Sequence, residues 1–333
     1  MDLLPLRADE ADVLLPGNDC LGGAVLKIHI MAATAVSLTM ISGTALAQVP
    51  PDLAEGIRKI GQVVDTPNTV KLYAPLFRNQ TEPYPNVTVA RDVAYGPDPL
   101  NKFDVFTSGP ATQSGKMAVV FVHGGGFERG DKRQPGSPFY DNLMLWATQQ
   151  GMIGINLNYR LAPKNTWPAA HEDMAAFMRW LQANIAQYGG DSNRVVLWGQ
   201  SAGASLIAGY LAHPQFYGPK GHGVIGAVMN SGFYENDRGG SAYFGSDPKE
   251  LQERSALEGM KKVTIPLFIS HTEVDLPDAI TQADRAKKAL CDAGRCPTYA
   301  VFKDHSHISQ NYSVGTGDTS VSGPILQFVR QIK

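Results

Sequence analysis

The chain has 333 residues, of which 43% are hydrophobic, and its formal net charge is −2. This length is sufficient for one large hydrophobic core, and a single domain of this size is ordinary among α/β proteins. The near-neutral charge provides no basic surface for nucleic acid, and no apolar run is long and uninterrupted enough for a helix that stays in a membrane. The composition says nothing about the oligomeric state.

The first 47 residues are predicted to be a leader and signal peptide rather than part of the fold. Lys27 precedes a moderately apolar stretch, and Ala45 and Ala47 form an A-x-A cleavage pattern typical of secretory signals. We therefore expect cleavage after Ala47 and export to the periplasm or the medium. The stretch before Lys27 is acidic, which a start codon assigned too far upstream would explain. A disordered leader followed by an ordinary helix is the alternative interpretation.

Residues 48–333 are predicted to form one domain in which buried strands alternate with helices. This alternation favours parallel strand pairing with right-handed crossovers. The first two strands alternate polar and apolar residues and should form an antiparallel edge, whereas 63–81 is irregular and 230–260 is polar and rich in loops. The predicted strands are 87–93, 103–106, 117–122, 153–158, 195–198, 224–229, 265–270 and 298–302. The predicted helices are 51–60, 140–150, 167–188, 202–212, 278–290 and 324–332.

One strand leads into a motif that is typical of a nucleophilic serine. The apolar run 195–198 ends at Gly199, Ser201 follows inside G-Q-S-A-G, and small residues continue to Ala212. This strand–turn–helix order is the layout of G-x-S-x-G, in which a tight turn holds the serine above the sheet edge. Such a turn excludes large side chains two positions away, and Gly199 and Gly203 meet that need. We predict that Ser201 is a nucleophile, although a bare G-x-S-x-G is short and common.

An acyl-transfer site also needs donors for the negative charge that develops on the carbonyl oxygen, and H-G-G-G at 123–126 supplies them. Consecutive glycines let the backbone turn its N–H groups toward the substrate without a Cβ in the way. We expect the oxyanion hole to consist of the amides of Gly125, Gly126 and Ala202. His123 precedes the serine in the chain, so we expect it to brace the loop rather than to act as the base.

The three cysteines indicate a small disulfide at most. Cys20 lies in the leader, and Cys291 and Cys296 flank a predicted helix end. In an oxidising compartment the last two would close one bridge, and two independent thiols are the alternative. Two cysteines without clustered histidines argue against a zinc site.

Three motifs in order give the sequence a specific resemblance. H-G-G-G-F is followed by N-Y-R-L-A-P with W-P-A-A-H-E-D, and then by Y-G-G-D-S-N-R-V-V-L-W-G-Q-S-A-G. From about residue 87 onward the chain resembles the α/β-hydrolase carboxylesterases, in particular the hormone-sensitive-lipase-like group and its feruloyl-esterase relatives. The resemblance implies an α/β-hydrolase fold, with a mostly parallel, doubly wound sheet, flanking helices and a small lid or cap. It also implies a serine esterase with the order Ser, acid, His that needs no metal or cofactor.

The resemblance places the acid just after the strand 265–270. Asp275 matches the family position best, and Glu273 and Asp278 are the alternatives. Asp278 is also suited to a helix N-terminus. A carboxylate here would orient the imidazole and stabilise its charged form.

The base is expected after the last strand, where K-D-H-S-H-I-S offers His305 and His307. Family members place the catalytic histidine directly before an apolar residue, which favours His307, before Ile308. His305 would then line the loop or contact the acid. His271, which precedes the acid, is expected to contact the catalytic groups only indirectly.

Several further residues of the motifs are expected to support the fold. Arg160 is predicted to form a salt bridge, with Glu172 and Asp173 as its partners, while Tyr159 belongs to the scaffold and Pro163 sets a turn.

Other aromatic and histidine residues receive separate predictions. Phe127 follows the glycines and is predicted to line the substrate pocket. Tyr234 and Tyr243 lie in the loop-rich segment and are candidates to cover the site. His171 and His213 are interpreted as helix-surface and helix-end residues.

These residues leave three functional hypotheses. The first is an exported serine carboxylesterase that hydrolyses short-chain acyl or aryl esters through an acyl-enzyme, with a small-molecule ester as its partner. The second is an arylformamidase-like amide hydrolase that uses the same triad. The third is a catalytically inactive binding protein of the same fold, which the presence of a serine, an acid and a histidine disfavours.

Overall fold

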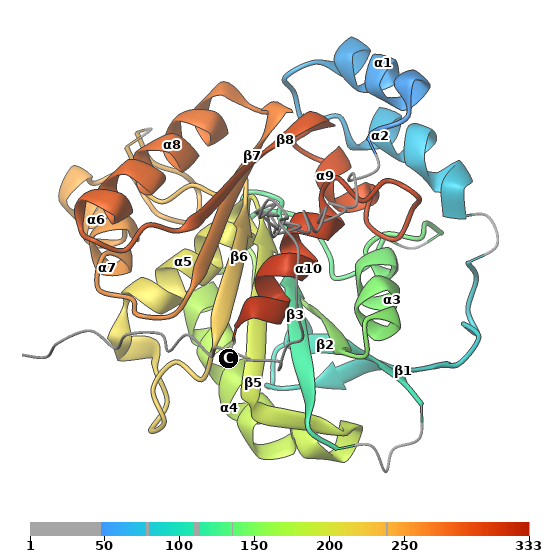
Figure 1. The fold of residues 1–333 in the computed structure, drawn as a ribbon. Coiled ribbons are helices and arrows are strands. Elements are labelled where there is room, and N and C mark those ends of the chain that lie inside the picture. Colours follow the sequence, from blue (N-terminus) through green and yellow to red (C-terminus); the bar gives the residue numbers. More distant parts are fainter. Residues whose placement is uncertain (1–47, 78–79, 110–113, 135, 238, 333) are drawn as a thin grey trace, which may run out of the picture. The chain divides into compact units, whose positions relative to one another are not determined.

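The computed structural model describes residues 48–77, 80–109, 114–134, 136–237 and 239–332. An eight-stranded sheet lies at its centre, and Figure 1 shows helices on both sides of this sheet. The predicted leader, including Cys20 and the cleavage site at Ala47, lies outside these residues. The strand order is β1-β2-β4-β3-β5-β6-β7-β8, and the described residues form one compact unit. The strands are β1 (Val87–Ala94), β2 (Lys102–Ser108), β3 (Lys116–Val122), β4 (Ile153–Leu157), β5 (Gly190–Gln200), β6 (Gly226–Asn230), β7 (Leu267–Val274) and β8 (Thr298–Ser306).

The pairing directions follow the sequence prediction. β1 is antiparallel to β2 and β2 is antiparallel to β4, whereas the pairs from β4 through β8 are parallel. All residues of β4 and β6 are buried, because a parallel sheet is covered by helices on both faces. The carboxyl ends of the parallel strands therefore meet at one edge, where loops carry side chains into a common site.

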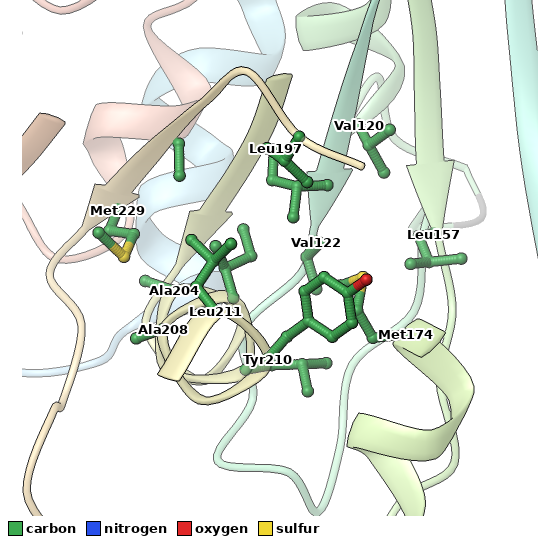
Figure 2. Packing of buried hydrophobic residues seen from close by; sticks show 14 of the residues in the cluster. Val120, Val122, Leu157, Met174, Leu197, Ala204, Ala208, Tyr210, Leu211 and Met229 are labelled. Carbon is green, nitrogen blue, oxygen red and sulfur yellow. The ribbon is translucent and has the colours of Figure 1, made fainter. Parts of the chain in front are cut away.

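Two helical layers cover the sheet, and each layer encloses its own hydrophobic cluster. Side chains of β3 alternate between them, with Val120 and Val122 in one cluster and Val119 and Phe121 in the other. Figure 2 shows the first cluster, in which Met174 of α4 and Leu211 of α5 pack beside strand residues. That layer comprises α4 (Ala169–Asn184), α5 (Ala202–Ala212) and α8 (Pro277–Asp292), and the other comprises α1 (Pro51–Ile60), α3 (Asp141–Gln149) and α10 (Ser322–Gln331).

The segment 63–81 was predicted to be irregular, and this prediction was wrong. It contains α2 (Thr66–Tyr73) and the 3-10 helix η1 (Ala74–Phe77). The side chain of Asp65 caps α2 by accepting a hydrogen bond from the amide of Asn68 at 3.0 Å. Tyr73 is fully buried in the second cluster, so tertiary packing stabilises a helix that has little periodicity of its own.

Short helices also occur where the sequence predicted only loops. In the segment 230–260 they are α6 (Pro248–Glu253) and α7 (Leu257–Met260), and after β8 the chain forms α9 (Ser309–Tyr312). Two 3-10 helices, η2 (Ile185–Tyr188) and η3 (Pro214–Phe216), follow α4 and α5. Across the described ranges, no helix is both long and apolar enough to cross a membrane.

Cys291, in the last turn of α8, forms a disulfide with Cys296 beyond the end of the helix. Gly294 lies between them with φ +74°, which the predicted helix end requires. The pairing that the sequence left open is therefore present in the structure.

Candidate active site

Ser201 occupies the turn between β5 and α5 in a strained backbone conformation, with φ 55° and ψ −123°. Its amide donates a hydrogen bond to the carbonyl oxygen of Asn230 at 2.9 Å. A Cβ on Gly199 would lie 2.5 Å from the backbone of Gly203, and one on Gly203 would lie 2.0 Å from the carbonyl oxygen of Val122. Both glycines are therefore required for the helix to start directly above the sheet.

The glycine loop lies beside this turn. Gly125 has φ +113° and Gly126 has φ +68°, and a Cβ on Gly125 would lie 2.0 Å from the carbonyl oxygen of Arg129. Within the described residues, the amides of Gly125, Gly126 and Ala202 donate no hydrogen bond. All three residues line one cavity with Ser201. The structure thus brings together the three amides that the sequence predicted for an oxyanion hole.

His123 braces this loop, in agreement with the sequence prediction. Its Nδ1 lies 2.7 Å from the carbonyl oxygen of Gly124, and its ring stacks on Tyr159 with 4.6 Å between ring centroids. The Tyr159 hydroxyl donates to the His123 carbonyl oxygen at 2.9 Å, which gives Tyr159 its predicted scaffold role. Burial lowers the pKa of His123, so the imidazole is neutral at pH 7.

Asp275 and His307 form a buried pair at the same edge of the sheet. His307 Nδ1 lies 2.6 Å from Asp275 Oδ1, and both side chains are almost fully shielded from solvent. Burial would raise the pKa of Asp275, but hydrogen bonding and the charge of His307, together with a hydrogen bond from Ser231, leave it below its ordinary value. The carboxylate is therefore ionised at neutral pH and holds His307 in one orientation.

Ser201 and His307 line the same cavity, which brings the nucleophile and base candidates to one place. Within the described residues the Ser201 hydroxyl donates no hydrogen bond to His307. Such contacts are often long before substrate binds and tighten in the complex.

The other candidate acids occupy different surroundings. The Glu273 carboxylate is exposed and accepts a hydrogen bond from the amide of Asp304 at 2.9 Å. Asp278 lies in the first turn of α8, where the helix dipole favours an acidic residue. Asp275 is the candidate whose carboxylate is seen to hydrogen-bond His307.

His305 has a carboxylate partner that the sequence analysis did not identify. Its Nε2 lies 3.2 Å from Asp318 Oδ2, and its Nδ1 lies 3.1 Å from the hydroxyl of Ser309. The side chain is fully buried and pairs with Asp318 rather than Asp275. The expectation that His305 could contact the acid was therefore wrong, because the loop before α10 supplies a second carboxylate.

His271 bonds the carbonyl oxygen of Thr272 at 2.9 Å and packs on Tyr299.

Three polar residues that the sequence analysis missed hold the Asp275–His307 pair. Ser231 donates to Asp275 Oδ2 at 2.5 Å, and Gln310 donates to the Ser231 hydroxyl at 2.6 Å. The His307 carbonyl oxygen accepts hydrogen bonds from Gln200 at 2.9 Å and from Gln310 at 3.0 Å. Gln200 immediately precedes Ser201, so one side chain ties the nucleophile turn to the histidine loop. The only sequence signal was its place inside G-x-S-x-G.

The cavity has a volume of about 570 Å³, and the segment after β6 lines part of it. We call residues 233–237 and 239–251 the lid. Phe127 lines the cavity, as predicted, and is almost fully buried. The cavity is also lined by Val64, Thr66, Glu128, Arg129, Gln134, Tyr140, Phe233, Glu235, Asn236, Ser241, Phe244, Leu251, Leu276 and Ile308.

Tyr234 and Tyr243 were candidates to cover the site, but both rings are buried and neither lines the cavity. The neighbouring Phe233 and Phe244 line it instead. His171 was interpreted as a helix-surface residue and is in fact buried, because the lid packs over that face of α4. Burial, with a smaller effect of His213, lowers its pKa well below the ordinary value.

The predicted salt bridge of Arg160 is present. Its Nε lies 2.8 Å from Asp173 Oδ1, and a guanidinium nitrogen lies 3.1 Å from Glu172 Oε2. These contacts tie the loop after β4 to the first turns of α4.

Comparison with known proteins supports the sequence resemblance. Residues 103–219 match the family model described as BD-FAE. The probable carboxylic ester hydrolase LipM of Mycobacterium tuberculosis is 33% identical over 117 residues, which cover 34% of this chain and 26% of that protein. Liver carboxylesterase 1 of Oryctolagus cuniculus is 28% identical over 212 residues, covering 60% of this chain and 33% of that one. The alignments thus span about a third or less of these curated relatives.

Solved structures share the fold over most of both chains. Esterase B from Lactobacillus rhamnosis has a TM-score of 0.63 at 17% identity and covers 74% of this chain and 85% of its own. A hyperthermophilic esterase from Pyrobaculum calidifontis has a TM-score of 0.62 at 18% identity, covering 86% and 98%. With the sheet order above, these likenesses confirm the predicted α/β-hydrolase fold. The family match and the named relatives confirm the predicted resemblance to esterases.

The lowered pKa of Asp275 predicts a pH-dependent contribution to stability. Because the folded protein binds this proton less tightly than the unfolded chain, the contribution is complete above the ordinary pKa of 3.8 and is lost as the pH falls through the lower value of the folded state. We expect the free energy of unfolding of wild type to exceed that of Asp275→Asn at about pH 5, and the difference to shrink as the pH falls below about 4. Urea unfolding from pH 3 to 7 measures it, and a difference that stays constant down to pH 3 would contradict the assignment.

Proposed function

We propose that the protein is a serine carboxylesterase that hydrolyses short-chain acyl or aryl esters through an acyl-enzyme. The observation that carries the proposal is the buried Asp275–His307 pair, with 2.6 Å between Nδ1 and Oδ1, whose histidine lines the same cavity as Ser201 and the glycine loop. Nucleophile, base, acid and oxyanion donors are the groups that ester hydrolysis requires. The esterase relatives and the BD-FAE match support the same class of reaction.

In the proposed first step, Ser201 Oγ attacks the ester carbonyl carbon while His307 Nε2 accepts the hydroxyl proton. The carbonyl π electrons move onto oxygen, and the amides of Gly125, Gly126 and Ala202 donate to this oxyanion. When the tetrahedral adduct collapses, the bond to the alkoxy oxygen breaks and His307 returns the proton to the leaving alcohol. Asp275 stabilises the imidazolium that exists between these proton transfers.

In the second half, water replaces the alcohol. His307 accepts a proton from a water molecule while the water oxygen attacks the acyl carbon. The same amides donate hydrogen bonds to the second oxyanion. Collapse breaks the bond to Ser201 Oγ, which recovers its proton from His307, and the carboxylic acid leaves. This sequence requires only the chain's own side chains and water.

The cavity supports a small ester as the substrate. Its volume of about 570 Å³ falls within the range of roughly 300–1,000 Å³ found for small-molecule sites. Phe127, Phe244 and Ile308 provide apolar walls for a short acyl or aryl group. The more exposed Glu128 and Arg129 belong to the polar part of the lining.

Substitution of the proposed nucleophile and base tests the assignment directly. Ser201→Ala and His307→Ala should each lower kcat for p-nitrophenyl acetate about 10⁴-fold or more, because both residues act as one unit. Ser201→Ala should also abolish labelling by a fluorophosphonate. Circular dichroism serves to show that the variants fold.

His305→Ala is the informative comparison for the base, since His305 is the neighbouring histidine and pairs with Asp318. A folded His305→Ala variant should retain fluorophosphonate labelling, which His307→Ala should lose. Near-wild-type turnover by folded Ser201→Ala would overturn the proposal. If instead His305→Ala lost fluorophosphonate labelling and His307→Ala retained it, His305 would be the base.

A substrate series tests the substrate class. We expect kcat/KM to be highest for p-nitrophenyl acetate, p-nitrophenyl butyrate or methyl ferulate and to fall toward the decanoate, because the apolar part of the cavity is of limited size. N-formylkynurenine is included as an amide of the second hypothesis. Preference for this amide over every ester would replace the esterase proposal with amide hydrolysis, and preference for the decanoate would overturn the short-chain assignment.

We further propose that the protein is exported and cleaved after Ala47. The A-x-A pattern at Ala45–Ala47 supports this proposal, and so does the Cys291–Cys296 disulfide, because disulfides persist mainly in oxidising compartments. Protein recovered from the periplasm or the medium should begin at Gln48 by N-terminal sequencing. Recovery of the full-length chain from the cytosol alone would contradict export.

A further inference from the structure

The lid contains a closed turn at 241–245. Ser241 and Gly245 exchange two backbone hydrogen bonds of 2.9 Å. Arg254, which directly follows α6, donates a hydrogen bond to the carbonyl oxygen of Phe244 at 2.5 Å. Hydrogen bonds therefore hold the turn at its two end residues and at Phe244. Tyr243 lies at its centre, and its side chain is fully buried although the lid forms the cover of the cavity.

The Tyr243 ring stacks on Phe127, the residue that follows the glycine loop. The ring centroids are 4.3 Å apart and the planes differ by 5°. Phe127 has φ +64°, a conformation that costs free energy for a residue with a large side chain. Such a conformation persists only when its surroundings enforce it, and the stack on Tyr243 is one contact that does so. Phe244 adds an edge-on contact to the same ring at 5.2 Å.

The Tyr243 ring is itself anchored to the start of α4. Its hydroxyl accepts a hydrogen bond from the amide of Ala170 at 3.0 Å and lies 2.9 Å from His171 Nδ1. Because burial keeps His171 neutral, its Nδ1 can accept a hydrogen bond from the Tyr243 hydroxyl. The Tyr243 carbonyl oxygen accepts from the amide of Trp167 at 2.8 Å. Both ends of the residue are thus attached to the same helix start.

Space for this anchor depends on Gly209 of α5. A Cβ on Gly209 would lie 2.2 Å from His171 Nε2, so any larger residue would displace the imidazole beneath Tyr243. The glycine is required by close packing rather than by its backbone angles.

We propose that Tyr243 is a positioning residue for the oxyanion hole, holding the Phe127 ring so that the adjoining Gly125 and Gly126 amides stay turned toward the cavity. The carbonyl side of the loop is held independently, since Phe127 accepts from the amide of Ala162 at 2.8 Å. The Gly124 and Gly125 carbonyl oxygens share peptide planes with the Gly125 and Gly126 amides, and they accept hydrogen bonds from His123 Nδ1 at 2.7 Å and from the amides of Glu128 and Arg129 at 3.2 and 3.1 Å. The stack on Phe127 adds a side-chain constraint at the residue that follows these planes. Tyr243 would therefore influence the site through its contact with Phe127, although Tyr243 itself does not line the cavity. This inference rests on the proposed function.

The test compares Tyr243→Leu, which removes the stack, with Tyr243→Phe, which keeps the ring and removes the hydroxyl. We expect Tyr243→Leu to lower kcat for p-nitrophenyl butyrate about 10- to 100-fold with KM within twofold, since loss of one oxyanion donor costs about 10²–10³ and misplacement costs less. Tyr243→Phe should retain kcat within about threefold, because its ring can still stack on Phe127.

A trifluoromethyl ketone provides the second readout. Ser201 Oγ forms a bond to its carbonyl carbon, the proton passes to His307, and the π electrons become an oxyanion in the loop. The inhibition constant for Tyr243→Leu should rise by about the same factor as kcat falls, because both report stabilisation of an oxyanion.

Tyr210→Leu is the matched control. Tyr210 is equally buried, donates its hydroxyl to the His222 carbonyl oxygen at 3.0 Å, and does not line the cavity. This variant should lose thermal stability while kcat and the inhibition constant stay within about twofold of wild type. Equal kinetic losses in both leucine variants would overturn the inference, as would unchanged ketone affinity in Tyr243→Leu. If Tyr243→Leu does not fold, a Tyr243→Phe variant that loses more than about tenfold in kcat overturns the role of the ring, and retention of kcat supports it.

The two proposals fail in different ways. If wild type hydrolyses no ester and is not inhibited by the ketone, the esterase proposal itself fails. If wild type does both and the Tyr243 variants match it, only the positioning role is overturned.

Discussion

The close approach of α5 to the sheet at Gly203 is the constraint on which the site depends. A Cβ there would lie 2.0 Å from the carbonyl oxygen of Val122, so only glycine lets the helix begin directly over β3. This packing holds Ser201 in its strained turn, with its amide bonded to Asn230 and its hydroxyl at the edge where the parallel strands end. The Ala202 amide remains without a partner in the described structure and lies beside the glycine loop. One steric requirement therefore places both the proposed nucleophile and a proposed oxyanion donor.

A second arrangement places His307, the proposed base. Asp275 is almost fully buried and would be costly to ionise without partners, yet four hydrogen bonds, from Ser231, His307 and the amides of Thr272 and Leu276, stabilise its charge. Gln200 and Gln310 hold the His307 backbone from two sides. Since Gln200 immediately precedes Ser201, the histidine loop is tied to the nucleophile turn through a single side chain. In the proposed esterase this network would keep the reacting groups in place, because misplacement of a reacting group by 1 Å can cost about 10²-fold in rate.

The lid contributes the third part of the site. Its residues Phe233 and Phe244 line the cavity, while Tyr243 points into the protein and stacks on Phe127. The segment that lines part of the cavity is thus packed against the loop that would hold the oxyanion. In the proposed esterase, changes in the lid would then alter turnover as well as substrate choice, because the two parts share one aromatic contact.

The sequence alone determined the α/β architecture, the antiparallel edge, the nucleophile turn and the Gly125–Gly126 loop, because each depends on local periodicity or on glycines that a tight backbone demands. It reduced the acid to three candidates and the base to two, and only the folded chain brought Asp275 against His307 rather than pairing His305 with it. Tertiary structure alone revealed three further features. They are the helix α2, the buried position of His171, and the hydrogen bonds of Ser231 and Gln310. Their contacts join segments far apart in the chain, such as Ser231 with Gln310, and carry no local pattern.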